Sequence, residues 1–417
     1  MNGKRCRAIW IVSMVSAFGG ARLTPAQVGT VQTEQKISET TGGFGGALDP
    51  NDLFGSRASL IGDLDRDGIP DIAAGAYLDD DGGTDQGALW ILFLNSDGTV
   101  KSEQKISETA GAFGGALYAD DRFGISMTSL GDLDRDGNSD LAVGAYRDDD
   151  GGTNQGAVWI LFLNANGTVK SEQKISETTG GFGGSLDPID SFGFHVSSLG
   201  DLDRDGISDL AVSAREDDDG GTDQGAVWIL FLNADGTVKS EQKISETTGG
   251  FGGALDPFDW FGQAITSLGD LDRDGNPDIA VSANLDDDGG ADQGAIWILF
   301  LNADGTVKSE QKISETTGGF SGALDPGDRF AHDVTILARA AGNPALVVGA
   351  SFDDDGGTDQ GALWLLSLNS DGTVASHLKI SEVAGGFGGV LNLGDQFGSS
   401  VSSIGDLDAD GNPELVV

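Results

Sequence analysis

The chain has 417 residues, and its 67 acidic side chains against 24 lysines and arginines give a formal net charge of −43. This acidity argues against binding to nucleic acids or anionic membranes, because their phosphates would repel the protein. Apolar residues make up 38% of the chain and recur in short blocks such as GALWILFLN, so the chain is not expected to be disordered.

Residues 1–26 are predicted to be a secretory signal peptide. MNGKRCR is basic, AIWIVSMVSAFGG is apolar, and ARLTPA offers small residues before a cleavage point after Ala26. A membrane anchor is the alternative, although the apolar run is short for a span. The only cysteine, Cys6, lies in this segment, so no disulfide is expected in the mature chain. The predicted location is secreted, extracellular or at the cell surface, with no membrane insertion after signal removal.

Internal repeats occupy residues 27–417. Phe-Gly or its equivalent marks units that start near residues 54, 123, 192, 261, 330 and 397, four spacings being 69 residues and the last 67. Each complete unit contains a first strand, an acidic loop, a short apolar strand, a DDDGG loop, a strongly apolar strand, an Asp-Gly turn and a polar strand. Residues 88–94 are apolar at all seven positions, which indicates a strand covered on both faces.

These repeats predict an all-β fold, a β-propeller of four-stranded antiparallel blades. Six blade units are visible, and seven are possible if the chain is truncated. Residues 29–38 match the fourth strand at residues 98–107, while the C-terminus supplies only a first and a second strand. We therefore expect the two ends to share a last blade, which closes the ring and lacks a third strand.

The acidic loop has the pattern D-x-D-x-D-G-x-x-D, in which alternate aspartates point oxygens inward from a tight turn. Hard cations such as Ca²⁺ take six to eight oxygen ligands, so the pattern predicts a calcium site, with a backbone carbonyl at position seven. A metal-free acidic turn is the alternative, but five copies at a fixed phase favour an oxygen cage. The predicted ligands are Asp63, Asp65, Asp67, Ile69 and Asp71; Asp132, Asp134, Asp136, Asn138 and Asp140; Asp201, Asp203, Asp205, Ile207 and Asp209; Asp270, Asp272, Asp274, Asn276 and Asp278; and Asp406, Asp408, Asp410, Asn412 and Glu414.

Unit five departs from this pattern, because its loop reads ILARAAGNPALVV and has no carboxylate. No metal is predicted there. The motifs together resemble the FG-GAP repeat of integrin α-subunit propellers and their bacterial relatives. Phe54-Gly55, the Asp63–Asp71 loop and Gly75-Ala76 carry the resemblance, and Phe123-Gly124 with Gly144-Ala145 repeats it. The resemblance implies a propeller, commonly seven-bladed, with Ca²⁺ loops on one rim and ligand recognition on the other.

Other repeated features have plainer interpretations. The DDDGG loops begin at residues 79, 148, 217, 286 and 353 and have three interpretations: a second cation site, a recognition surface or a solvated loop. The solvated loop is favoured. Trp90, Trp159, Trp228, Trp297 and Trp364 lie in the third strands, where packing between blades is favoured over sugar binding. The three histidines share no position in the repeat and form no catalytic constellation that spacing can support.

The sequence therefore predicts a secreted calcium-binding propeller, not an enzyme, that recognises an extracellular protein or glycan in adhesion. A propeller-fold polysaccharide lyase or hydrolase is the alternative. It is disfavoured because a central active site needs unlike residues from different blades, whereas these blades vary little. A third possibility is a scaffold for domains missing from the chain. The sequence identifies neither the ligand nor the oligomeric state.

Overall fold

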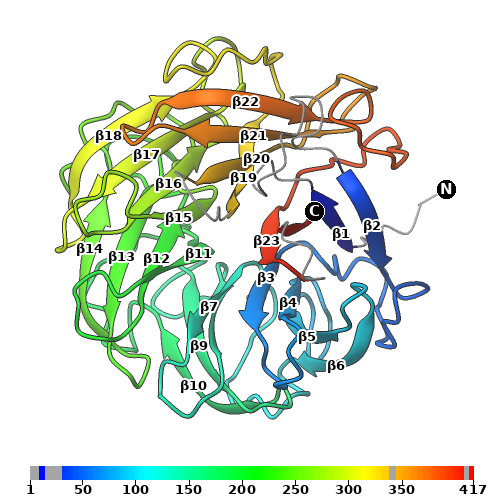
Figure 1. Ribbon diagram of the computed structural model, residues 1–417. Coiled ribbons are helices and arrows are strands. Elements are labelled where there is room, and N and C mark those ends of the chain that lie inside the picture. Colours follow the sequence, from blue (N-terminus) through cyan, green and yellow to red (C-terminus); the bar gives the residue numbers. More distant parts are fainter. Residues whose placement is uncertain (1–8, 15–30, 338–343, 408–412) are drawn as a thin grey trace. The chain divides into compact units, whose positions relative to one another are not determined.

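The computed structural model describes residues 9–14, 31–337, 344–407 and 413–417 as an all-β protein (Figure 1). Five sheets each contain four strands that follow one another along the chain, with antiparallel neighbours. These are the blades of a β-propeller, as the sequence predicted. Packing divides the chain into two compact units, built mainly from Gln35–Asp217 and from Ile244–Val417.

The strands of the five complete blades succeed one another in chain order. They are, for blade one, β3 (Ala58–Gly62), β4 (Asp71–Ala76), β5 (Ala88–Leu94) and β6 (Val100–Ile106); for blade two, β7 (Met127–Gly131), β8 (Asp140–Ala145), β9 (Ala157–Leu163) and β10 (Val169–Ile175); for blade three, β11 (Phe192–Gly200), β12 (Asp209–Ala214), β13 (Ala226–Leu232) and β14 (Val238–Ile244); for blade four, β15 (Ile265–Gly269), β16 (Asp278–Ala283), β17 (Ala295–Leu301) and β18 (Val307–Ile313); and for blade five, β19 (Phe330–Leu337), β20 (Ala345–Ala350), β21 (Ala362–Leu368) and β22 (Val374–Ile380).

A further sheet has the order β2-β1-β24-β23 and uses strands from both ends of the chain. Its members are β1 (Ile9–Met14), β2 (Val31–Ile37), β23 (Ser402–Gly405) and β24 (Glu414–Val416). Since β23 has four residues and β24 only three, this sheet is partial. The prediction of six blade units is thus corrected to five complete blades and a partial sheet.

The place of β1 also corrects the prediction that the shared blade lacks a third strand. This strand lies between β2 and β24, where a third strand belongs. Its sequence, IWIVSM, resembles LWLLSL at residues 363–368 of blade five, with a tryptophan second and a serine fifth. That similarity would have predicted the third strand of the shared sheet from the sequence. The predicted signal peptide, 1–26, includes this strand, and its cleavage remains a prediction.

The core lies between neighbouring blades because the second and third strands of the blades are covered on both faces. All residues of β8 and β9 are buried, and double coverage was predicted for the third strand. In the first of the two compact units, Val158 and Ile160 of blade two belong to the same hydrophobic cluster as Val212 and Leu230 of blade three. Phe182, from the Gly-rich link, stands 4.9 Å from the Trp228 ring at a steep angle. The predicted packing role of the tryptophans is confirmed.

Candidate metal centre

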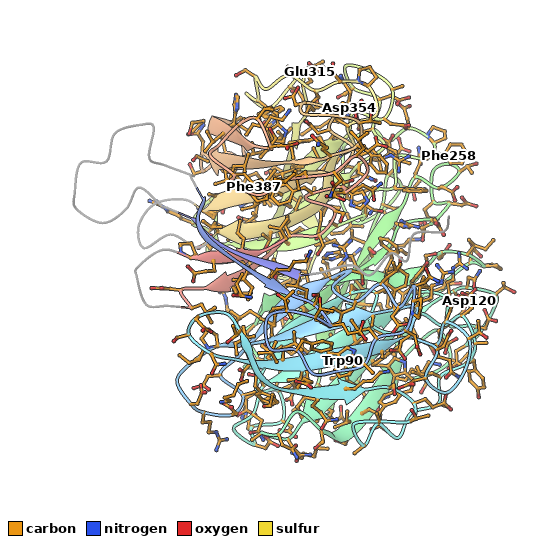
Figure 2. All side chains as sticks on the ribbon, turned by 90° about the vertical axis from the view of Figure 1, so that its right-hand side faces the viewer. Trp90, Asp120, Phe258, Glu315, Asp354 and Phe387 are labelled. Atoms are coloured by element: carbon orange, nitrogen blue, oxygen red, sulfur yellow. The ribbon has the colours of Figure 1, made fainter. Side chains whose placement is uncertain are left out.

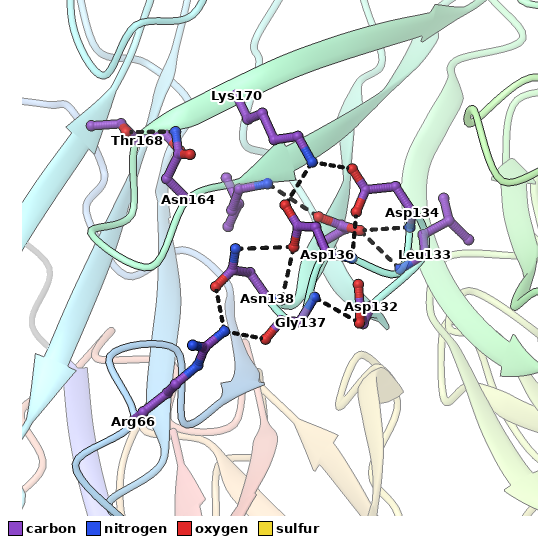
Figure 3. Close-up of polar contacts among 12 residues, drawn as sticks. Arg66, Asp132, Leu133, Asp134, Asp136, Gly137, Asn138, Asn164, Thr168 and Lys170 are labelled. Atoms are coloured by element: carbon purple, nitrogen blue, oxygen red, sulfur yellow. Dashed lines mark hydrogen bonds and ion pairs between the residues drawn. The ribbon is translucent and has the colours of Figure 1, made fainter.

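The loop between β7 and β8 brings three carboxylates together (Figure 3). One oxygen each of Asp132, Asp134 and Asp136 lies within 4.8 Å of the other two. Groups of three also form in three other blades, where the third member is the buried aspartate that ends the motif: Asp63, Asp65 and Asp71; Asp201, Asp203 and Asp209; and Asp270, Asp272 and Asp278. In each of four loops, the structure therefore brings together predicted ligands of that same loop.

Backbone amides hold these carboxylates within the loop. Gly137 N donates to Asp132 Oδ2 at 2.9 Å, Asp136 N donates to Asp134 Oδ1 at 3.1 Å, and Asn138 N donates to Asp136 Oδ1 at 2.9 Å. Gly137 has a φ of +92°, a conformation that favours glycine and sharpens the turn after the third aspartate. The alternating aspartates thus stabilise the backbone of the loop, and they also supply oxygen atoms that could bind a metal ion.

Asp140, the acid that ends the motif, anchors the loop to the sheet. It is fully buried, and its two oxygens accept hydrogen bonds from Leu133 N at 2.8 Å and Leu163 N at 3.1 Å. Burial raises the pKa of this carboxyl to about 6, against the lowering effect of these bonds. Asp71, Asp209 and Asp278 make the same two bonds in their blades.

A lysine from the fourth strand completes the site. Lys170 Nζ lies 2.5 Å from Asp134 Oδ2 and 2.6 Å from Asp136 Oδ2. The register of β10 against β9 shifts between Val169 and Ser171, so Lys170 is the extra residue of a β-bulge. Its hydrogen bond lowers the pKa of Asp136. The equivalent lysines, with the same two contacts, are Lys101, Lys239 and Lys308.

Blade five shows that the lysine and the acidic loop occur together. Its fourth strand reads VASHLKI where the other blades read VKSEQKI, so Ala375 replaces the lysine. The β21–β22 pairing keeps the register shift between Ser367 and Leu368, and only the charge is missing. This blade also has no aspartates in its loop, of which residues 338–343 lie outside the described residues. Comparison of the fourth strands would have revealed the lysine from sequence.

An arginine links consecutive loops. Arg66 Nη2 donates to Gly137 O at 2.8 Å and to Asn138 Oδ1 at 3.2 Å in the next loop (Figure 3). Arg66 has a φ of +63°, which is uncommon for a residue with a side chain. Arg135 reaches Gly206 O at 3.4 Å in the same way. This contact was not predicted from the sequence, although the arginine recurs inside four of the motifs.

The chemistry of this donor set fits a divalent cation. Its carboxylate oxygens are hard ligands of the kind that Ca²⁺ prefers, and they converge from alternate positions of one loop. Lys170 already neutralises part of the charge, so an ion would share Asp134 and Asp136 with an ammonium group. In the last predicted site Glu414 Oε2 accepts from Leu407 N, as Asp140 does from Leu133 N, whereas Asp408, Asp410 and Asn412 lie outside the described residues.

The second acidic loop is not simply solvated, which corrects the favoured prediction for its first residue. Asp148 is 1% exposed, and Lys174 Nζ lies 2.7 Å from its Oδ2 and 2.7 Å from Asp150 Oδ2. Asp121 is also buried, and burial together with the charge of Asp148 raises its pKa to about 7. This loop is therefore a structural ion pair beside a buried carboxyl group.

Comparison with known proteins gives the family. A family model described as FG-GAP repeat matches residues 54–92, 123–161, 192–230 and 261–299, which run from the first strand into the third in four blades. The chain is an FG-GAP repeat β-propeller. In the FG-GAP propeller, a Cβ added at Gly144 would collide with the carbonyl oxygen of Gly193 in the next blade, so the family glycine permits close packing.

The FG-GAP propeller is similar to several integrin α-chains. It is 30% identical to Integrin alpha-6 of Homo sapiens over 166 residues, which is 39% of this chain and 13% of that protein. It is 30% identical to Integrin alpha pat-2 of Caenorhabditis briggsae over 251 residues, 56% of this chain and 19% of the relative. It is 34% identical to Integrin alpha-PS2 of Drosophila melanogaster over 161 residues, 37% and 11% respectively. The FG-GAP propeller thus spans less than a fifth of these relatives. Among its described residues, no helix is long and apolar enough to cross a membrane.

Proposed function

We propose that this propeller is a secreted recognition module that binds an extracellular protein or glycan in adhesion, with Ca²⁺ ordering its acidic loops. The observation that carries the proposal is the place where near-identical repeats differ. The residue three positions before Phe-Gly or its equivalent changes in almost every copy and has a positive φ in each: Asn51, Asp120, Ile189, Phe258, Gly327 and Gly394. The aspartate that follows it is the same in all six copies: Asp52, Asp121, Asp190, Asp259, Asp328 and Asp395.

These variable positions expose side chains that a folded core would bury. Ile189 and Phe258 are each 53% exposed, and Phe258 lies at the end of a loop beyond the strands of its sheet (Figure 2). Left-handed backbone is unfavourable for a β-branched or aromatic residue, so isoleucine and phenylalanine have a cost here that packing does not offset. A surface role explains their presence better than a structural one.

In the first compact unit, arginines and aromatic residues lie in the loops beside Phe-Gly and in those after Gly-Ala or Ser-Ala. Arg122 donates to Tyr146 Oη at 2.7 Å, and Arg147 contacts Asp120 Oδ2 at 2.9 Å. The guanidinium carbon of Arg215 lies 3.6 Å from the centre of the Phe194 ring. The Tyr146 and Phe194 rings are buried, and the arginines are paired with Asp120 and Glu216, so this grouping orders the loops beside the variable positions.

The convergent carboxylates support the proposal of calcium binding. The similarity to integrin α-chains supports the proposal of a role in adhesion. Ca²⁺ would be held by carboxylates such as Asp132 and Asp134, with the Asn138 carbonyl also predicted. The predicted signal peptide is the basis for secretion, although its cleavage would remove β1 from the shared sheet. N-terminal sequencing of exported protein tests it. If the first residue were not Gln27, the predicted cleavage point would be wrong.

The test of recognition is binding of the purified chain to arrays of glycans and matrix proteins, with and without calcium. Ile189→Ser and Phe258→Ser should each weaken binding to a captured ligand without lowering the melting temperature. Ser171→Ala, at an exposed position of β10, is the matched control. Equal binding by all variants would reject a recognition role for these two positions, and turnover of a polysaccharide would favour the enzymatic alternative.

A further inference from the structure

Each DDDGG loop ends in a buried glutamine whose amide orientation is set by the protein. These glutamines are 3–6% exposed: Gln86, Gln155, Gln224, Gln293 and Gln360. In blade one, Gln86 Nε2 donates to Leu117 O at 2.6 Å, in the link to the next blade. In blade four, Gln293 Nε2 donates to Leu324 O at 2.6 Å. The amide nitrogen is therefore committed to a carbonyl, and the oxygen must point the other way.

That oxygen has no hydrogen-bond partner in any of the five blades, among the residues that the structure describes. A buried acceptor without a donor costs about 1–3 kcal/mol. One such atom would be a local defect, but five at the same position in the repeat indicate a bound group.

A glutamate carboxylate lies beside the glutamine Oε1 in each of these loops. A Cβ added at Gly289 would collide with Gln293 Oε1 and would lie 2.9 Å from Glu315 Oε2. Glu315 follows β18 and is labelled in Figure 2; its other oxygen accepts from Leu324 N at 3.4 Å. In the other blades the equivalent glutamate oxygen would lie 3.1 Å from a Cβ added at the equivalent glycine in blade one, 2.8 Å in blades two and three and 3.5 Å in blade five; the glutamates are Glu108, Glu177, Glu246 and Glu382. Glu108 Oε2, like the glutamine oxygens, is buried without a partner.

The remaining charges around this point favour a cation over a neutral ligand. In blade four Lys312 is engaged by Asp286 and Asp288, each at 2.7 Å, and Asp287 Oδ1 accepts from Asp292 N at 2.8 Å. One lysine thus stands against three aspartates and a glutamate. A water molecule could donate to both oxygens, but it would leave this excess negative charge in place.

We propose that each of the five blades holds a hard cation, such as Ca²⁺, at a further site between the glutamine Oε1 and the glutamate Oε2. Amide and carboxylate oxygens are both ordinary Ca²⁺ ligands, and waters would complete the shell. Glycine is favoured beside this pair because a Cβ there would collide with the glutamine oxygen, and because Gly289 has a φ of +100°. This site uses none of the residues of the first acidic loop. Blade five keeps Gln360 and Glu382 although it lacks that loop, so the two sites are separable within one protein.

The test is a crystal structure of the full chain soaked in Tb³⁺, which replaces Ca²⁺ and scatters anomalously. We expect an anomalous peak between glutamine and glutamate in all five blades, blade five included. Water-like density without anomalous signal at these positions would overturn the proposal, whereas peaks at the first loops would be unaffected. Failure of this site and failure of the first centre are thus distinguishable.

A solution measurement with a charge-matched control completes the test. At saturating Ca²⁺, equilibrium dialysis of Glu315→Gln should show one ion fewer per chain than the parent protein. Glu310→Gln removes the same charge from β18 of that blade and should lose none. An amide can still bond to a water, so equal stoichiometry in both variants would identify a hydrated void and reject the ion. The far-ultraviolet spectrum confirms that each variant is folded.

Discussion

Lys170, on the fourth strand of blade two, is paired with Asp134 in the loop between the first and second strands, at 2.5 Å. The β-bulge aims the lysine, and it is replaced by alanine in blade five, whose loop lacks acids. The ammonium group therefore belongs to the acidic loop and reduces its self-repulsion when no ion is present. This relation qualifies the calcium hypothesis, because the loop is not held by an ion alone.

Replacing Lys170 by methionine should strengthen calcium binding at this loop and lower the stability of the calcium-free protein. The variant frees two carboxylate oxygens for the ion but leaves their repulsion uncompensated without it. Calorimetric titration and thermal melting in chelator measure the two effects. Ser171→Ala, next to the bulged residue, is the control. Unchanged calcium affinity would show that the lysine and the ion do not compete.

Asp140→Asn should destabilise the protein even without calcium, by about 1–3 kcal/mol, because an amide nitrogen would face a backbone N–H that now has an acceptor. Asp132→Asn, at an exposed position of the same loop, should lower calcium affinity with a smaller change in metal-free stability. Urea unfolding in chelator separates these effects. The anchoring role of Asp140 would be rejected if both variants unfolded at the same urea concentration as the parent.

Calcium removal should lower the melting temperature, because an ion that binds only the folded state stabilises it by about 2.7 kcal/mol per site at a hundredfold excess over Kd. Hydrogen exchange should locate the loss in β7–β8 and equivalent loops. The β19–β20 connection of blade five should change less. A melting temperature indifferent to chelator would contradict metal binding at both kinds of site.

Trp159→Ala should cost about 3–5 kcal/mol, because it leaves a cavity in a packed core. Phe113 lies 5.0 Å from the Trp159 ring and 5.3 Å from Phe123, so the loss removes one wall of an aromatic stack. Trp159→Phe should recover part of the stability. Chemical unfolding measures both variants, and a sugar-binding role would instead leave stability unchanged and alter glycan binding.

Mild acid should stabilise the calcium-free protein. Burial raises the pKa of Asp121 and of Asp259 to about 7, against 3.8 for an ordinary aspartate. As pH falls from 8 to 5, the folded state takes up these protons and the unfolded state does not, so the free energy of unfolding rises. The gain stops near pH 4, where the unfolded chain also binds protons. Asp121→Asn, which keeps an acceptor for Tyr118 N, should flatten the profile measured by urea unfolding at each pH.

Sequence reasoning worked where information is local and repeated. The period of 69 residues, the doubly apolar third strand and the Asp-Gly turn predicted the blades, because strand pairing in a hairpin depends on neighbouring residues. It failed at β1, whose partners β2 and β24 come from opposite ends of the sequence. No local pattern shows which strand fills a position between them.

By itself, the sequence determined the four-stranded repeat, the burial of the tryptophans and the alternating carboxylates of each loop. Only the tertiary structure decided which charges meet. Lys170 is 36 residues from Asp134, and Arg66 is 71 residues from Gly137, yet both pairs are in contact. Glu315 and Gln293 converge on one glycine for the same reason. Electrostatic partners are chosen by distance in space, which depends on bulges and on the stacking of blades, and chain spacing does not encode that distance.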